Sequence, residues 1–181
     1  GWTQPTAQPT AQPTQPANIS GFAVSIGTVK GNVGEEVTVP VNLVNVPSSG
    51  ITTADMTITY DASKLEYVSG EAGSIVTNTS VNFGINKGSD GVIKTLFLDY
   101  TMSEGAIKTS GVYANITFKV KSSGTANINI TNSTFGDQAL KSISAQVVGG
   151  SVSQNDSTNV QPTQGWTQPT AQPTAQPTQP A

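Results

Sequence analysis

The stretch that decides the fold is Val112-Tyr113-Ala114-Asn115-Ile116-Thr117-Phe118-Lys119-Val120, in which two kinds of side chain alternate. The even-numbered residues are all apolar, and the residues between them are Tyr113, Asn115, Thr117 and Lys119. Because successive side chains of a β-strand point to opposite faces, this alternation predicts a half-buried strand with its even-numbered residues in the core.

Residues 53–60 repeat this pattern. The apolar set of this segment, which we expect to point inward, is Ala54, Met56, Ile58 and Tyr60. The set expected to point outward is Thr53, Asp55, Thr57 and Thr59. Two clean alternations so far apart in the chain indicate a sheet that is half-buried along much of its length.

Similar short segments, separated by Gly, Asn, Asp or Pro, recur along the chain. They predict nine strands, at residues 22–29, 36–44, 51–60, 65–69, 80–86, 92–101, 111–121, 126–131 and 143–152. The best helix candidate, residues 62–67, follows a turn signal and is interpreted as a turn that leads into a strand. The fold class is therefore all-β, a nine-stranded jelly-roll β-sandwich flanked by Pro/Thr-rich linkers.

Two of the predicted strands carry the candidate recognition residues. In residues 80–86 we expect Val81, Phe83 and Ile85 to point inward, and Asn82, Gly84 and Asn86 outward. Residues 92–100 (VIKTLFLDY) are apolar on both parities toward their end. If Leu96 and Leu98 are core, Phe97 faces outward beside Thr95 and Asp99, as an apolar anchor with a polar rim. The alternative is that the parity is reversed and Phe97 is core.

The two ends of the chain are identical: residues 1–17 (GWTQPTAQPTAQPTQPA) recur letter for letter as residues 165–181. Identical Pro/Thr-rich spacers are typical of modules repeated along a carrier chain. We therefore expect a linker at 1–17, one module at 18–154 and a linker at 155–181. Seventeen residues in polyproline geometry span about 50 Å. Trp2 and Trp166, the only tryptophans, lie in these linkers and are candidates for docking on a module surface.

Composition excludes several function classes. The chain has a net charge of −3, and its eight cationic residues are all Lys, which argues against a nucleic-acid or membrane surface. Cys, His and Arg are absent, which excludes disulfides, Ser-His-Asp and Cys-His catalysis, and histidine metal sites. No run of apolar residues is long enough for a spanning helix, no signal peptide is evident, and no Asp-rich calcium loop is present.

Several segments together resemble the cohesin modules of bacterial cellulosomal scaffoldins, most closely type I. The resemblance covers residues 21–152, and the order and spacing of its segments make it specific. The matching segments are 34–41 (GEEVTVPV), 50–51 (GI), 54–56 (ADM), 60–66 (YDASKLE), 96–98 (LFL), 110–120 (SGVYANITFKV) and 147–152 (VVGGSV).

The resemblance implies a non-catalytic module that binds dockerins, the small calcium-loaded helical modules of cellulosomal enzymes. It implies no cofactor in this module, calcium in the partner, sister modules on the same chain, and an extracellular or cell-surface complex. It places the dockerin on one flat sheet face, at Thr53, Asp55, Gly84, Asn86, Thr95, Phe97, Asp99, Glu104, Gly105, Leu140 and Ser142. The alternation in residues 80–86 adds Asn82 to the expected contact residues. Thr53, Asn86 and Ser142 differ from residues common in type I members, which leaves the choice of partner open.

Three other functions remain open at this point. A glycosidase would need paired carboxylates, and Asp55 and Asp99 are candidates, although a flat face does little to raise the pKa of one of them. A carbohydrate-binding module usually stacks aromatic rings on sugars, and Tyr100 and Tyr113 are the tyrosines expected to be exposed. A structural spacer domain would need no binding face at all.

Overall fold

The computed structural model describes residues 18–101 and 104–154. The segments expected to be linkers, residues 1–17 and 155–181, lie outside this part of the chain. No helix among the described residues is long and apolar enough to span a membrane.

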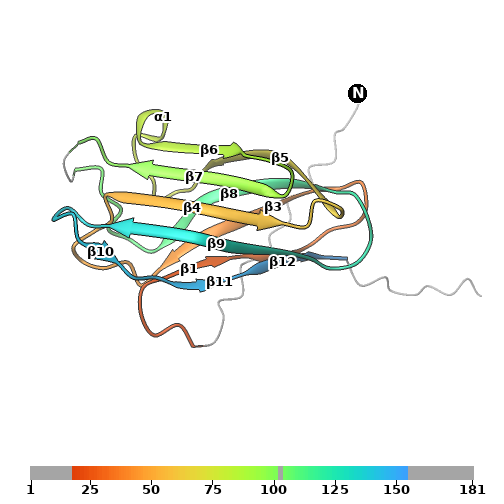
Figure 1. Ribbon diagram of the computed structural model, residues 1–181, viewed down its shortest axis with the longest axis horizontal. Helices are drawn as coiled ribbons and strands as arrows, with labels where there is room; N and C mark the ends of the chain where they lie inside the picture. Colours follow the sequence, from red (N-terminus) through yellow and green to blue (C-terminus); the bar gives the residue numbers. More distant parts are fainter. Residues whose placement is uncertain (1–17, 102–103, 155–181) are drawn as a thin grey trace, which may run out of the picture.

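Two β-sheets pack face to face (Figure 1). The five-stranded sheet has the order β11 (Gln146–Val148), β1 (Ala23–Ile26), β3 (Glu36–Val44), β8 (Gly111–Val120), β5 (Leu65–Ala72). The seven-stranded sheet has the order β2 (Thr28–Lys30), β12 (Gly150–Ser153), β9 (Ala126–Gly136), β4 (Thr53–Tyr60), β7 (Val92–Leu98), β6 (Phe83–Lys87), and β10 (Ser142–Ile143) pairs with β9. The predicted all-β sandwich is confirmed.

One core fills the space between the sheets, and its side chains come from the predicted alternations. The inward set of β4, Ala54, Met56, Ile58 and Tyr60, is buried. The inward set of β8 is buried from Ala114 through Ile116 and Phe118 to Val120. Aromatic rings cross between the sheets, as where Tyr60 of β4 meets Phe118 of β8 with ring centroids 5.0 Å apart.

The described residues form twelve strand segments rather than the nine predicted strands. The expected strand 22–29 divides at Gly27, whose backbone N–H donates to the carbonyl of Pro40 at 2.8 Å. Its first part, β1, belongs to the five-stranded sheet and its second part, β2, to the seven-stranded sheet. The expected strand 143–152 divides in the same way into β10, β11 and β12. The sequence pattern predicted each of these two stretches as one strand, whereas the structure divides each of them between the two sheets.

The two divided stretches, β1–β2 and β11–β12, connect the two sheets along one side of the sandwich, whereas the opposite side has no such connection. β1 and β11 pair in parallel in one sheet, and their continuations β2 and β12 pair in parallel in the other. On the opposite side, β5 and β6 are the edge strands of their two sheets, and no ladder joins them. We call this side, between β5 and β6, the open seam.

A single helical turn, α1 (Thr79–Asn82), stands where the sequence predicted the start of a strand. The turn begins at Asn78, which has a left-handed backbone (φ 50°). It reverses the predicted orientation of two side chains: Val81 is 64% exposed and Asn82 only 3%. A helical turn has a period of 3.6 residues, so the two-residue alternation used for a strand does not hold there.

Tyr113 also differs from its predicted orientation, because its side chain is fully buried. The register of β8 against β3 shifts here: Ala114 lies opposite Val41, and Val112 lies opposite Asn42. Tyr113 is thus the extra residue of a β-bulge, which interrupts the alternation and lets two consecutive side chains point inward.

Candidate functional site

The outer face of the seven-stranded sheet brings together many of the predicted site residues. In the ladders, Asp55 of β4 lies opposite Thr134 of β9 and Leu96 of β7, and Leu96 lies opposite Gly84 of β6. Residues in register on neighbouring strands share a face, so these four form one row across the sheet. We call them the central row.

A second row lies beside the central row, nearer the β6–β7 turn. In it Asn86, Lys94, Thr57 and Asn132 are in register. On the other side, Thr53 lies opposite Leu98 and Gly136. The structure therefore places Thr53, Asp55, Gly84 and Asn86 on one face, as expected.

The expected outward orientation of Phe97 is wrong. Phe97 is fully buried, and its ladder partner Ala54 is fully buried beside it. Thr95, also expected outside, is 2% exposed, whereas Leu96, expected in the core, is 52% exposed. The reversed parity applies along β7, so the large apolar side chain that this strand exposes on the outer face is Leu96.

A signal for this parity was present in the sequence. Lys94 lies two residues before Leu96 and therefore shares its face. Placing Leu96 in the core would bury a lysine, which costs far more than burying the hydroxyl of Thr95. Lys94 is exposed in the structure.

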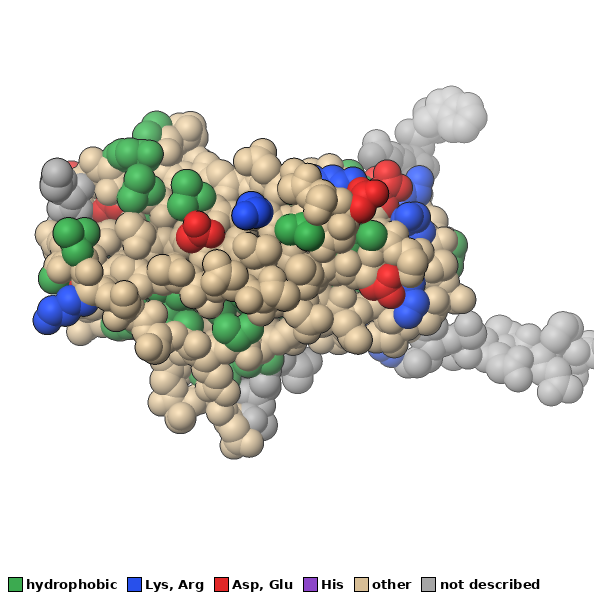
Figure 2. Space-filling model, viewed as in Figure 1, with side chains coloured by type: hydrophobic (Ala, Val, Ile, Leu, Met, Phe, Trp, Pro, Cys, Tyr) green, Lys and Arg blue, Asp and Glu red, His purple; other side chains and the backbone are tan. Residues whose placement is uncertain are grey.

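Charge is sparse over the middle of this face. Figure 2 looks onto it and shows isolated charged and apolar side chains among uncharged ones, with charged side chains gathered toward the right-hand end. Asp55 is exposed and makes no hydrogen bond or ion pair with any described residue. Its carboxylate remains available as an acceptor for donors from another molecule.

Acidic side chains near the other end of the sheet have partners within the protein. Lys87 and Asp90 approach to 2.6 Å across the β6–β7 turn. Their hydrogen bond raises the pKa of the Lys87 ammonium and lowers the pKa of the Asp90 carboxyl. In the β4–β5 loop, a hydrogen bond from the Ser63 hydroxyl lowers the pKa of Asp61.

The predicted residues after β7 belong to a loop that is held by internal hydrogen bonds. Asp99 Oδ1 accepts the backbone N–H of Thr101 at 2.9 Å and its hydroxyl at 2.6 Å. Thr101 Oγ1 in turn accepts the N–H of Gly105 at 2.7 Å. Gly105 is buried, and a Cβ there would lie 2.7 Å from Asp99 Oδ1. Glu104 is exposed, so a partner could reach its side chain but not one at position 105.

Asn82 is a further predicted contact residue that the structure buries, in addition to Phe97, Thr95 and Gly105. Its Oδ1 accepts the backbone N–H of Tyr100 at 3.5 Å, which ties α1 to the end of β7. On either side of this bond, Val81 is 64% exposed and Tyr100 is 63% exposed. The sequence pattern missed Val81 because it predicted a strand there.

Leu140 and Ser142 lie at the same end of the sheet, in and after the turn between β9 and β10. Asp137 Oδ1 accepts the N–H groups of Ala139 at 2.9 Å and Lys141 at 3.0 Å, which fixes this turn. Leu140 has a left-handed backbone (φ 59°) and is 90% exposed. The hydrogen bonds of the β9–β10 turn hold Leu140 in a strained left-handed backbone conformation with its side chain in solvent. Ser142 is exposed beside it.

Two buried hydroxyls lie beneath the central row. Thr95 Oγ1 and Tyr113 Oη are inaccessible to solvent, and neither has a hydrogen-bond partner among the described residues. Burial raises the pKa of Tyr113 well above its usual range, and the Thr95 hydroxyl partly offsets this effect as a weak hydrogen-bond partner that falls short of good geometry. Tyr113 is therefore unavailable as a sugar-stacking ring, and Tyr100 is the tyrosine that is exposed.

The arrangement suits recognition of a surface better than chemistry on a small molecule. No group of three or more Asp or Glu residues in the described ranges could hold a metal ion. Asp99, the proposed partner of Asp55 in a carboxylate pair, is engaged with Thr101. The central row combines an acceptor that no described residue pairs with, an exposed leucine and a glycine that has open space above its Cα. These are features of a protein-binding face.

Comparison with known proteins gives the family. The cohesin domain model matches residues 22–153. Over 144 residues the chain is 40% identical to the Cellulose-binding protein A of Clostridium cellulovorans, covering 80% of this chain and 7% of that protein. Over 106 residues it is 37% identical to the Cellulosome-anchoring protein of Acetivibrio thermocellus, covering 58% of this chain and 24% of that protein.

Solved structures agree with this assignment. The sixth cohesin of scaffoldin B from Acetivibrio cellulolyticus, in complex with a mutant Cel5 dockerin, superposes with a TM-score of 0.73 at 55% identity, covering 75% of this chain and all of that one. A type I cohesin of Clostridium thermocellum, in the Coh-OlpA–Doc918 complex, has a TM-score of 0.71 at 31% identity, with coverages of 75% and 100%. The chain therefore belongs to the cohesin domain family, a family of non-catalytic binding modules.

Proposed function

We propose that this module binds a dockerin through the outer face of its seven-stranded sheet and so attaches an enzyme or another scaffold protein to a carrier chain. The observation that carries the proposal is the central row, in which Asp55 lies in register with Leu96 and has no hydrogen-bond or ion-pair partner among residues 18–101 and 104–154. The neighbours from Acetivibrio cellulolyticus and Clostridium thermocellum, which superpose over their whole length, are cohesins in complex with dockerins.

The face offers a partner two kinds of interaction. Asp55 would accept hydrogen bonds from hydroxyl groups or helix-end N–H groups of the dockerin, a strong contact once water is excluded. Leu96 would be the central apolar anchor, in the place that the sequence assigned to Phe97. Leu140 would add apolar contact at the rim, since it is the most exposed large apolar residue described. Glycine at position 84 would let the partner's backbone approach.

The rest of the assembly is inferred from the relatives. Calcium would belong to the dockerin, as the resemblance to scaffoldin cohesins implies. Residues 1–17 and 155–181 would be spacers between sister modules on an extracellular or cell-surface scaffold. The relatives are a cellulose-binding, a cellulosome-anchoring and two cellulosomal-scaffolding proteins, of which this chain covers only a part.

Calorimetric titration of the full chain tests the proposal. The chain is titrated, with calcium present, against a panel of type I and type II dockerins and against a soluble cello-oligosaccharide. One-to-one binding to a dockerin that is abolished by a calcium chelator is the expected result. Heat from the oligosaccharide with none from any dockerin would replace this function by carbohydrate binding.

A further inference from the structure

The outer face of the seven-stranded sheet carries one cationic side chain close to the carboxylate of its central row. On β4, β6, β7 and β9, all of which lie in the described ranges, the charged residues that share this face are Asp55 and Lys94. Leu96 is in register with Asp55, and Lys94 precedes Leu96 by two residues on β7, so Lys94 lies diagonally across the ladder from Asp55. Diagonal neighbours have Cα atoms about 7 to 8 Å apart. The face therefore offers opposite charges at a defined spacing.

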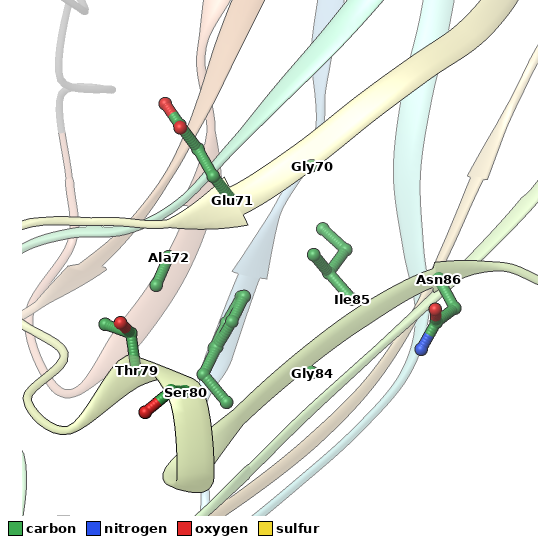
Figure 3. Close-up of a pocket in the computed structure, with 9 residues that line it drawn as sticks. Gly70, Glu71, Ala72, Thr79, Ser80, Gly84, Ile85 and Asn86 are labelled. Carbon is green, nitrogen blue, oxygen red and sulfur yellow. The ribbon is translucent and has the colours of Figure 1, made fainter.

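The neighbours of Lys94 in the second row do not neutralise its charge. Lys94 lies in register with Asn86 on β6 and Thr57 on β4, which are both uncharged. No ion pair or hydrogen bond joins the Lys94 ammonium to another residue of the described chain. Figure 3 looks into the groove of about 500 Å³ at the open seam, where Ile85 points into the gap and Asn86 points away from it. Glu71 of β5 also points away from β6 in this view.

Lys119 of β8 shows the opposite case, a lysine whose counterions come from the fold. It lies on the outer face of the five-stranded sheet, in register with Glu36 on one side and Glu66 on the other. Lys119 and Lys94 are both exposed residues of interior strands. Opposite charges directly across a ladder stabilise a sheet, and Lys94 lacks them in its own row. Its ammonium group is therefore available to a carboxylate of another molecule.

The spacing of Asp55 and Lys94 suits one turn of a helix that lies on the sheet. Helical residues three or four positions apart face the same side, with Cβ atoms about 5 to 6 Å apart. The flexible four-carbon stem of lysine covers the remaining difference. A helix that brings a hydrogen-bond donor to Asp55 can therefore bring a carboxylate to Lys94 from the adjacent turn. Leu96 shares the face with both residues and would be covered by the same helix.

We propose that Lys94 determines partner specificity by binding an Asp or Glu of a dockerin helix, one turn away from the residue that binds Asp55. This role rests on the proposed function and adds to it the charge pattern of the surface that is recognised. A dockerin with a carboxylate in this place is favoured. A dockerin with Lys or Arg there is rejected, because like charges would meet where water is excluded.

Charge-changing substitutions at Lys94 test this proposal in the full chain. Lys94→Gln removes the charge, and Lys94→Glu reverses it. The control is Lys119→Gln, which changes the net charge by the same amount on the opposite sheet. The probe is the dockerin of the type I and type II panel that binds the parent chain most tightly. Its affinity is measured by calorimetry, with calcium, in roughly 0.05 M and 0.5 M NaCl, because salt screens exposed charges.

At low salt, Lys94→Gln should weaken binding about threefold to tenfold, and Lys94→Glu should weaken it further. The difference between the parent and Lys94→Gln should shrink at high salt, and Lys119→Gln should bind like the parent. If the parent binds a dockerin and both Lys94 variants keep its affinity and salt dependence, this role of Lys94 is overturned while the proposed function stands. If the parent binds no dockerin, both are overturned.

A double-mutant cycle identifies the carboxylate on the partner. Each exposed Asp or Glu of the dockerin helices, outside its calcium loops, is replaced singly by Asn or Gln. Each variant dockerin is then titrated against the parent chain and against Lys94→Gln. One of these replacements should weaken binding to the parent at least about threefold more than binding to Lys94→Gln. Additive effects at every carboxylate would overturn the proposed contact.

Discussion

The outer faces of the two sheets differ in whether their polar side chains have partners on the same face. On the five-stranded sheet, Glu36, Lys119 and Glu66 lie in register with alternating charge, and the hydroxyls of Thr38 and Thr117 are 3.3 Å apart. On the seven-stranded sheet, the central row contains the exposed Leu96 and Asp55, which has no partner in the described part of the chain. A face that only meets water places its polar groups against one another. An available acceptor beside an exposed apolar side chain is what the proposed dockerin-binding face would offer to a partner.

The largest difference in stability should be found between alanine substitutions at two adjacent residues of β7, Phe97 and Leu96. Phe97→Ala should lower the free energy of unfolding by about 3 to 5 kcal/mol, because it leaves a cavity in a fully packed core. Leu96→Ala should change it by less than about 1 kcal/mol, because half of that side chain is already exposed. Urea denaturation of the two variants measures both values.

Equal destabilisation by the two substitutions would contradict the assignment of faces on β7. A Phe97→Leu variant is the companion measurement in case Phe97→Ala does not fold. It keeps most of the apolar volume, so it should fold with an intermediate loss of stability.

The sequence was sufficient for the fold where one alternation runs through a whole strand. Residues 54–60 and 114–120 have apolar side chains on one parity only, and the structure places them as predicted. It was insufficient at Leu96, Phe97 and Leu98, because three consecutive apolar residues do not show which side chains point into the core. There the pairing with β4 decides which side chains are buried. That ladder brings Phe97 beside Ala54, a contact between strands that are far apart in the sequence.

Local backbone irregularities account for the other errors. The β-bulge at Tyr113 and the helical turn that buries Asn82 each interrupt the two-residue alternation on which the prediction depends. Neither has a residue type that would signal it in advance. The predicted orientation was therefore right for Asp55 and Gly84, which face outward, and wrong for Phe97, which is buried while Leu96 is exposed.

Asp55→Ala should have the largest effect on binding. Removing the desolvated acceptor should weaken binding to a cognate dockerin by about 2 to 5 kcal/mol, since the partner's donors would be left unpaired. The matched control is Glu66→Ala, an exposed carboxylate of β5 on the opposite sheet. Calorimetric titration should show no change for Glu66→Ala, and unchanged affinity for Asp55→Ala would remove Asp55 from the interface.

Leu96→Ala should weaken the same binding less, by about 1.5 to 3 kcal/mol, the range for burying a leucine side chain. The control on the other sheet is Val68→Ala, an apolar residue of β5 that is 43% exposed. The titration should separate the two substitutions. If both leave the affinity unchanged, the exposed leucine of the central row is an ordinary surface residue.

Tyr113→Phe should raise stability by about 1 kcal/mol, because it removes a buried hydroxyl that has no partner among the described residues. Tyr100→Phe is the control, since the Tyr100 ring is 63% exposed and its hydroxyl is not required to be desolvated. Thermal unfolding measures both. A loss of stability in Tyr113→Phe would mean that the hydroxyl of Tyr113 makes a favourable contact, for example with a buried water next to Thr95.

The smallest effect on stability should come from substitution of Asp61, a carboxylate that accepts hydrogen bonds within its own loop. Asp61 accepts the backbone N–H of Ser63 at 3.0 Å, and its pKa lies below the ordinary 3.8, chiefly because of the hydrogen bond from the Ser63 hydroxyl. A lowered pKa in the folded state contributes stability above the unfolded pKa, and this contribution is lost as the pH falls through the folded value. Asp61→Asn should therefore lower the thermal midpoint slightly at pH 7, and the difference should shrink below about pH 4. Dockerin affinity should not change, in contrast to Asp55→Ala, because Asp61 lies in the β4–β5 loop and not on the central row. A difference in midpoint that grows as the pH falls would show that the charge of Asp61 opposes folding.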